Sequence, residues 1–172
     1  MKRLFSILSL AILLVFSGCT GDDGPPGPQG PPGESEVIEI TNVNFTAPSY
    51  TIRHTFRNPI LDSDHVLVYR LDGIDQGADV WRLVPQTYFL SEIPIDFNYN
   101  YDFTKFDTAI FLQGNNDLGR LPDQYRINQV FRIVVVPGFF NNRSSIALDL
   151  NNYDAVIKAY GINDKNRTII KL

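Results

Sequence analysis

Cysteine and histidine are scarce in this chain of 172 residues, and long uncharged runs are few. The single cysteine excludes a disulfide within one chain. Only two histidines are present, and no nucleophile-elbow, zinc-protease or phosphate-loop motif occurs, so we expect no enzyme. The formal net charge is −4 and no basic patch lies among aromatic residues, which argues against a nucleic-acid partner.

The N-terminus has the three parts of an export signal. Lys2 and Arg3 give it a positive start, and an uncharged run of 13 residues follows at 4–16. That run is shorter than the roughly 20 apolar residues that span a bilayer, and two small residues separate it from Cys19. Residues 1–18 are therefore predicted to be a signal peptide that is removed.

Residues 15–19, Val-Phe-Ser-Gly-Cys, resemble a bacterial lipobox, with Phe16 where leucine is usual. The resemblance implies that Cys19 becomes the first residue and carries acyl chains such as palmitate; the alternative is an unmodified thiol. Two or more chains make a firm membrane anchor. The acidic pair Asp22 and Asp23 looks like the surface-export signal of Bacteroidota lipoproteins. We expect an outer-membrane lipoprotein that faces the cell exterior, with a periplasm-facing orientation as the alternative.

The segment that follows, completing a tether over residues 19–35, has glycine at every third position. These glycines are Gly21, Gly24, Gly27, Gly30 and Gly33. Five of the eleven prolines lie among them, which is a collagen-like pattern because only glycine fits the axis of a triple helix. Two interpretations remain open. The segment is either a single polyproline II spacer, roughly 45 Å long, or a short triple helix that makes the protein a homotrimer.

Residues 36–172 have the composition of one β domain. Strands are predicted near 37–45, 49–57, 65–72, 80–90, 95–103, 107–113, 125–136 and 167–171. A helix is predicted at 152–160, where apolar residues recur at helical spacing between a capping asparagine and Gly161. The fold class is therefore all-β: an antiparallel β-sandwich of about eight strands with one short helix.

Four stretches of this domain resemble the collagen-like lipoproteins of Bacteroidota. They are residues 64–71, 80–88, 99–103 and 131–137. Together with the signal, the lipidated cysteine and the glycine triplets, the resemblance covers nearly the whole chain. It implies an anchor, a stalk and a β domain, and it implies no activity and no catalytic residue.

A loop with three carboxylates is the first candidate binding site. Asp72, Asp75 and Asp79 lie within eight residues on a glycine-containing turn, and oxygen ligands of this kind suit Ca²⁺. Aspartate and glycine are also favoured in turns for backbone reasons alone. The loop is therefore either a calcium site or an ordinary turn; no other cofactor is expected.

An aromatic row is the second candidate site. Tyr99, Tyr101 and Phe103 alternate with polar residues along one predicted strand, and Trp81 and Tyr88 lie elsewhere. Such a row is either a platform on which sugar rings stack or the core face of the strand.

A third group, Asp62, Asp64 and His65, precedes a strand and suits a turn better than a catalytic base. The function that we expect from the whole chain is a lipid-anchored structural, adhesive or interaction module that contacts an extracellular protein or glycan. The alternative is a surface module that binds a glycan or calcium.

Overall fold

The computed structural model describes residues 35–138 and 148–172. The predicted signal peptide, Cys19 and the glycines of the tether lie outside the described residues. Within the described part, no helix is long and apolar enough to cross a membrane.

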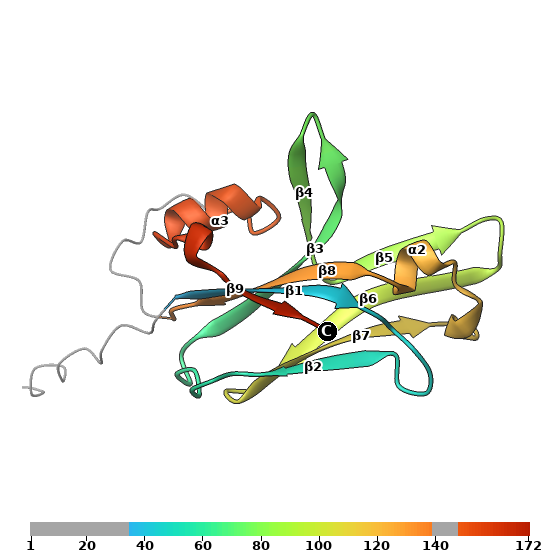
Figure 1. The fold of residues 1–172 in the computed structure, drawn as a ribbon, viewed down its shortest axis with the longest axis horizontal. Helices are drawn as coiled ribbons and strands as arrows, with labels where there is room; N and C mark the ends of the chain where they lie inside the picture. The colour runs from blue at the N-terminus through green and yellow to red at the C-terminus, as the bar shows by residue number, and fades with distance from the viewer. Residues whose placement is uncertain (1–34, 139–147) are drawn as a thin grey trace, which may run out of the picture. The chain divides into compact units, whose positions relative to one another are not determined.

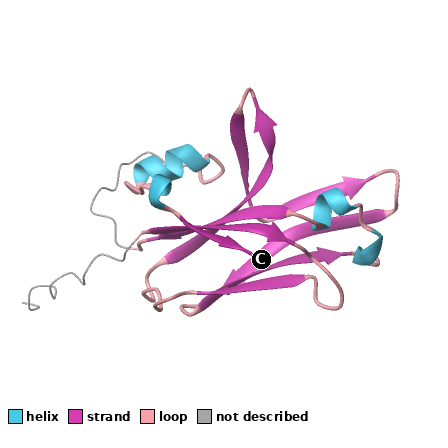
Figure 2. Cartoon of the chain, in the orientation of Figure 1, coloured by secondary structure: helices cyan, strands magenta, loops and turns pink. Residues whose placement is uncertain are grey.

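The described chain forms two β-sheets with a few short helices (Figures 1 and 2). The larger sheet has five strands in the order β4-β3-β8-β1-β9. Their bounds are β4 Ala78–Leu83, β3 His65–Asp75, β8 Gln129–Val136, β1 Glu36–Val43 and β9 Thr168–Lys171. The β1–β9 pair is parallel and the other pairs of this sheet are antiparallel.

The second sheet has four antiparallel strands in the order β2-β7-β6-β5. Their bounds are β2 Thr51–Thr55, β7 Asp107–Gly114, β6 Ile95–Phe103 and β5 Gln86–Leu90. The predicted all-β sandwich is confirmed, with nine strands among the described residues and one parallel pair.

Four short helical segments complete the described chain. They are η1 Leu118–Arg120, α2 Asp123–Arg126, α3 Tyr153–Ala159 and η2 Asp164–Asn166. The predicted helix at 152–160 is confirmed as α3. Asn152 caps it by accepting a hydrogen bond from the Ala155 N–H, and Gly161 follows it with a φ of 61°.

Two predicted strands differ from the structure. The strand predicted at 80–90 is two strands: β4 belongs to the larger sheet and β5 to the smaller one. Pro85 stands between them and has no N–H for a ladder, so the chain changes sheets there. The strand predicted at 125–136 begins at Gln129, because α2 and a bend occupy its first residues.

The main core lies between the two sheets, and β6 and β8 show how the sequence builds it. Along β6, Ile95, Phe97 and Tyr99 are buried while Asp96 is exposed, as period-two alternation predicts. Along β8, residues 133–136 are all buried. They are buried on both faces because α3 covers the outer face of the five-stranded sheet and forms a second apolar cluster there.

Candidate functional site: a pocket between β4 and the α3 segment

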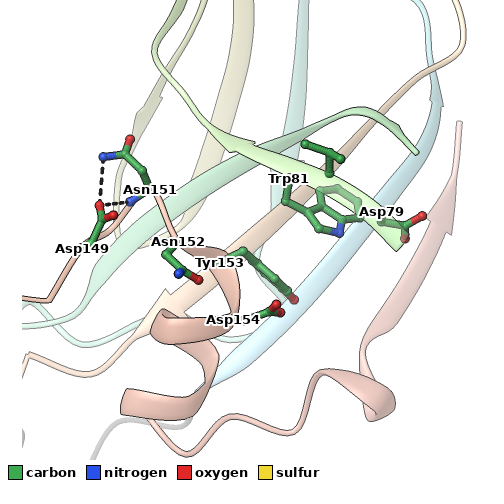
Figure 3. A pocket seen from close by; sticks show the side chains of 8 residues that line it. Asp79, Trp81, Asp149, Asn151, Asn152, Tyr153 and Asp154 are labelled. Carbon is green, nitrogen blue, oxygen red and sulfur yellow. Dashed lines mark hydrogen bonds between the residues drawn. The ribbon is translucent and has the colours of Figure 1, made fainter. Parts of the chain in front are cut away.

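An open pocket of about 390 Å³ lies between β4 and the chain that leads into α3 (Figure 3). We call it the Trp81 pocket. Its lining residues are Asp79, Val80 and Trp81 of β4, and Asp149, Asn151, Asn152, Tyr153 and Asp154 of the second segment. Carboxylates, amides and two aromatic rings therefore share one cavity.

Local hydrogen bonds accepted by side chains fix the segment at 149–155. The Asp149 carboxylate accepts from the Asn151 backbone N–H at 3.0 Å and from its side-chain amide at 3.1 Å, as Figure 3 shows. The Asn152 side chain caps α3. Within the described residues, no hydrogen bond or ion pair engages the carboxylates of Asp79 and Asp154, and both residues are exposed.

Aromatic rings form the wall of the Trp81 pocket. The ring centroids of Trp81 and Tyr153 are 5.9 Å apart, and Tyr69 packs edge-on to Tyr153 at 5.2 Å. The Arg132 guanidinium lies over both Trp81 and Tyr153, at 4.0 Å and 5.0 Å from the ring centroids. These distances are those of cation–π contacts.

Arg132 belongs to a network of four charges beneath this wall, which we call the Arg132 network. Glu39 Oε2 lies 2.9 Å from Arg132 Nε and 2.8 Å from Arg167 Nε. Asp164 Oδ2 lies 3.6 Å from Arg132 Nη1 and accepts a hydrogen bond from the Tyr153 hydroxyl at 3.1 Å. The network has two positive and two negative groups, so it is balanced within itself.

The Tyr153 hydroxyl is kept neutral by its surroundings. Burial raises its pKa, the Arg132 charge opposes that rise, the Asp164 charge adds to it, and the resulting pKa is about 12. At neutral pH Tyr153 therefore remains a hydrogen-bond donor to Asp164.

The Trp81 pocket itself is acidic. Asp79, Asp149 and Asp154 line it, and no lysine or arginine is among the described residues of its lining. Because the Arg132 network is already balanced, these three carboxylates give the pocket an excess of negative charge.

No family model, curated protein or solved structure matches this chain. The resemblance to collagen-like lipoproteins therefore stays a prediction.

The structure does not gather the three aspartates of the predicted calcium site. Strands β3 and β4 run through the expected loop and spread Asp72, Asp75 and Asp79 along a hairpin. Only Asp79 reaches the Trp81 pocket. Among the described residues, no group of three or more histidine, cysteine or acidic side chains could hold a metal ion.

Asp72 is instead the acceptor of a separate polar cluster. Its carboxylate lies 3.0 Å from Arg70 Nη1 and 2.7 Å from Arg82 Nε, and it accepts from the Tyr88 hydroxyl at 3.0 Å. Burial alone would raise the pKa of Asp72, but the hydrogen bond from Tyr88 and the two arginine charges outweigh it and lower the pKa. Asp72 is thus ionised, and its carboxylate is already engaged by two arginines and a tyrosine.

The aromatic row divides between core and surface. Tyr99 is fully buried, so the core interpretation holds for this residue and it cannot be part of an exposed platform. Tyr101 is half-buried and its hydroxyl donates to the Val66 carbonyl at 2.9 Å. Phe103, at the end of β6, is 39% exposed.

Asp64, of the third candidate group, supports a turn. It is 6% exposed, and it accepts from the Leu61 N–H at 3.0 Å and from the Gly138 N–H at 3.4 Å. The Asp64 carboxylate therefore stabilises the turn by accepting backbone hydrogen bonds, and no catalytic role is needed to account for it.

Sequence reasoning did not single out Glu39, Arg132 or Tyr153 as site residues. A signal for two of them exists: Glu39 stands between two isoleucines, and Arg132 interrupts a run of apolar residues in β8. A charge in the middle of an apolar strand predicts a buried partner, because an unpaired buried charge is costly.

Proposed function

We propose that this chain is a lipid-anchored surface module that binds a saccharide in the Trp81 pocket. The anchor rests on Cys19, which follows an export signal, and the glycine triplets provide reach beyond the membrane. The pocket provides the binding.

The observation that carries the proposal is the meeting of aromatic rings with hydrogen-bonding side chains in one open cavity. A volume of about 390 Å³ lies in the range of small-molecule sites. A sugar ring has an apolar C–H face and a rim of hydroxyl groups. The partly exposed Trp81 ring suits the face, with Tyr153, which is 6% exposed, packed behind it, and the carboxylates and amides suit the hydroxyls.

Arg132 supports the orientation of Trp81. Its guanidinium covers one face of the indole and is itself 5% exposed, so the ring is held from below. The part of the Trp81 side chain that stays exposed lines the pocket. A wall fixed in this way loses little conformational entropy when a ligand binds.

Trp81 is the only tryptophan of the chain, so its fluorescence reports directly on the pocket. We expect that titration of the full chain, purified in detergent, with saccharides of different composition will identify one that changes Trp81 emission with saturation. Asn151→Ala, which removes a lining amide, should lower the affinity for that saccharide. Asp102→Asn, an exposed change on β6, is the control and should leave it unchanged. If no saccharide gives a saturable change, the proposed function is wrong.

The anchor has its own test. Labelling of the expressing cells with a palmitate analogue should mark the native chain and leave Cys19→Ser unlabelled. If both the native chain and the variant are labelled, or if neither is, Cys19 is not the site of lipidation.

A second candidate function is adhesion to another protein. Ile74, near the tip of the β3–β4 hairpin, is 72% exposed, and Phe89, on the edge strand β5, is 77% exposed. Exposed apolar side chains of this size often mark contact surfaces. If Ile74→Ser and Phe89→Ser abolish cell attachment while saccharide binding persists, adhesion is a separate activity.

A further inference from the structure

Resting on the proposed function, we infer that the Trp81 pocket selects saccharides that carry an ammonium group over neutral and anionic saccharides. The ligand class is an amino sugar with a free amine. This inference concerns the charge of the ligand, whereas the proposed function concerns only its stacking and hydroxyl contacts.

The described lining of the pocket carries an excess of negative charge. Three carboxylates line the cavity, and no positive side chain is among its described lining residues. The nearest cation on its wall, Arg132, is paired with Glu39 and Asp164. Against the described lining, an anionic sugar would therefore meet repulsion, and a cationic sugar would meet attraction.

The three carboxylates of the pocket differ in whether they already accept hydrogen bonds. Asp149 is occupied by the loop that it closes, with two hydrogen bonds to Asn151. Asp79 and Asp154 have no hydrogen-bond or ion-pair partner among the described residues, and they come from different elements, Asp79 from β4 and Asp154 from the start of α3, as Figure 3 shows. Two free acceptors on separate walls suit the ammonium and hydroxyl groups of one ring.

The acidic side chains of the pocket are not clustered as metal ligands are. Within the described part of the chain they form no group that could hold a metal ion. A single small cation is therefore a poor match for this pocket. A ligand as wide as a sugar ring instead matches a cavity of about 390 Å³ that carboxylates and an aromatic ring line together.

The aromatic wall supports a cation independently of the aspartates. The Trp81 ring already accepts one cation within the fold, since the Arg132 guanidinium lies 4.0 Å from its centroid, and Trp81 remains partly exposed whereas Tyr153 is buried. The electron-rich faces of aromatic rings attract ammonium groups in the same way. Ring stacking and charge attraction thus favour the same ligand.

The test compares three oligosaccharides of equal length by Trp81 fluorescence, using the full chain in detergent at mildly acidic pH. One is a glucosamine oligomer, one is its N-acetylated neutral form, and one is an oligomer of a uronic acid. We expect the glucosamine oligomer to bind at least about tenfold more tightly than the neutral form, and the uronic acid to bind most weakly. Raising the salt from about 0.01 M to about 1 M should remove most of this preference.

Two double variants separate the pocket from the general acidity of the chain. The double variant Asp79→Asn, Asp154→Asn should bind the glucosamine oligomer no more tightly than the neutral form. Asp62→Asn with Asp102→Asn makes the same change in net charge at exposed positions outside the pocket lining, and it should leave the preference intact. Equal melting temperatures of the variants will show that folding is unaffected.

The outcomes distinguish the two proposals. If the neutral oligomer binds as tightly as the cationic one, or if the pocket variant keeps the preference, this inference is wrong while saccharide binding stands. If none of the three oligomers nor any other saccharide changes Trp81 emission, the proposed function fails and this inference fails with it.

Discussion

The guanidinium carbon of Arg132 lies 4.0 Å from the centroid of the Trp81 ring. Arg132 is in β8, at the centre of the larger sheet, and Trp81 is in β4, at its edge. The contact therefore joins the pocket wall to the most buried strand of the sheet. Glu39, on β1, holds the same guanidinium from the other side of β8.

Glu39→Gln should destabilise the domain. The change removes the charge that neutralises Arg132 and Arg167, of which Arg132 is 5% exposed. Because a buried charge that loses its partner costs several kcal/mol, and glutamine keeps one acceptor, we expect a loss of about 2 kcal/mol in the free energy of unfolding. Urea denaturation followed by Trp81 fluorescence measures it.

The exposed ion pair between Arg53 and Asp107 provides the control. Its nitrogen and oxygen lie 2.6 Å apart, but the Arg53 side chain is 55% exposed. Arg53→Ala should change the free energy of unfolding by less than about 1 kcal/mol. If Glu39→Gln costs no more than Arg53→Ala, the Arg132 network does not stabilise the fold.

Asp72→Asn should lower stability at neutral pH and leave it nearly unchanged in acid. The folded state lowers the pKa of Asp72, so its contribution is complete above the unfolded pKa of about 3.9 and is lost as the pH falls through the folded value. We expect about 2 kcal/mol at neutral pH, because Arg70 loses its charged partner. Urea midpoints measured across this pH range test it. A difference that stays constant down to the lowest pH would contradict the assignment.

His54 should make the domain less stable in mild acid. Burial lowers the pKa of His54 from 6.5, with Glu36 partly opposing the shift. The unfolded chain therefore takes up a proton more readily than the folded one, and stability declines as the pH falls below about 6.5. His54→Gln should flatten the stability curve between about pH 7 and about pH 5. Thermal melts across this range provide the comparison.

Calcium should not stabilise the chain. Asp72 is occupied by two arginines, and no metal-holding group is present among the described residues. We expect the same melting midpoint with millimolar calcium and with a chelator. A rise that Asp75→Asn and Asp79→Asn abolish would restore the predicted site.

The glycine triplets are tested by the molar mass in solution of residues 20–172 and of residues 36–172. We expect monomers for both, because five triplets offer few hydrogen bonds against the entropy of ordering three chains. A trimer of the longer form alone would establish a triple helix. Trimers of both would place the assembly in the β domain.

The fold could be predicted largely because local patterns determine it. The alternation along 95–103 reproduces the bounds of β6, and helical spacing with a cap at Asn152 locates α3. The break at Pro85 was missed because apolar residues continue on both sides of it, although the two halves belong to different sheets.

The candidate site could not be predicted in the same way. Trp81 and Tyr153 lie far apart in sequence and meet only because α3 returns to the outer face of the sheet. Glu39 and Arg132 are separated by 93 positions. Periodicity identifies which face of a strand is buried, but it does not identify the partner of a charge on that face.

Strand β1 has neighbours on both sides, β8 and β9, and it begins directly after the predicted stalk. A pulling force that arrives through the stalk would therefore enter the domain at a strand whose backbone hydrogen bonds to two partners share the load. Forced unfolding is governed by the rate at which such contacts break together. Under the proposed function, tension between the anchor and a bound ligand would thus act first on a strand that is hydrogen-bonded on both edges.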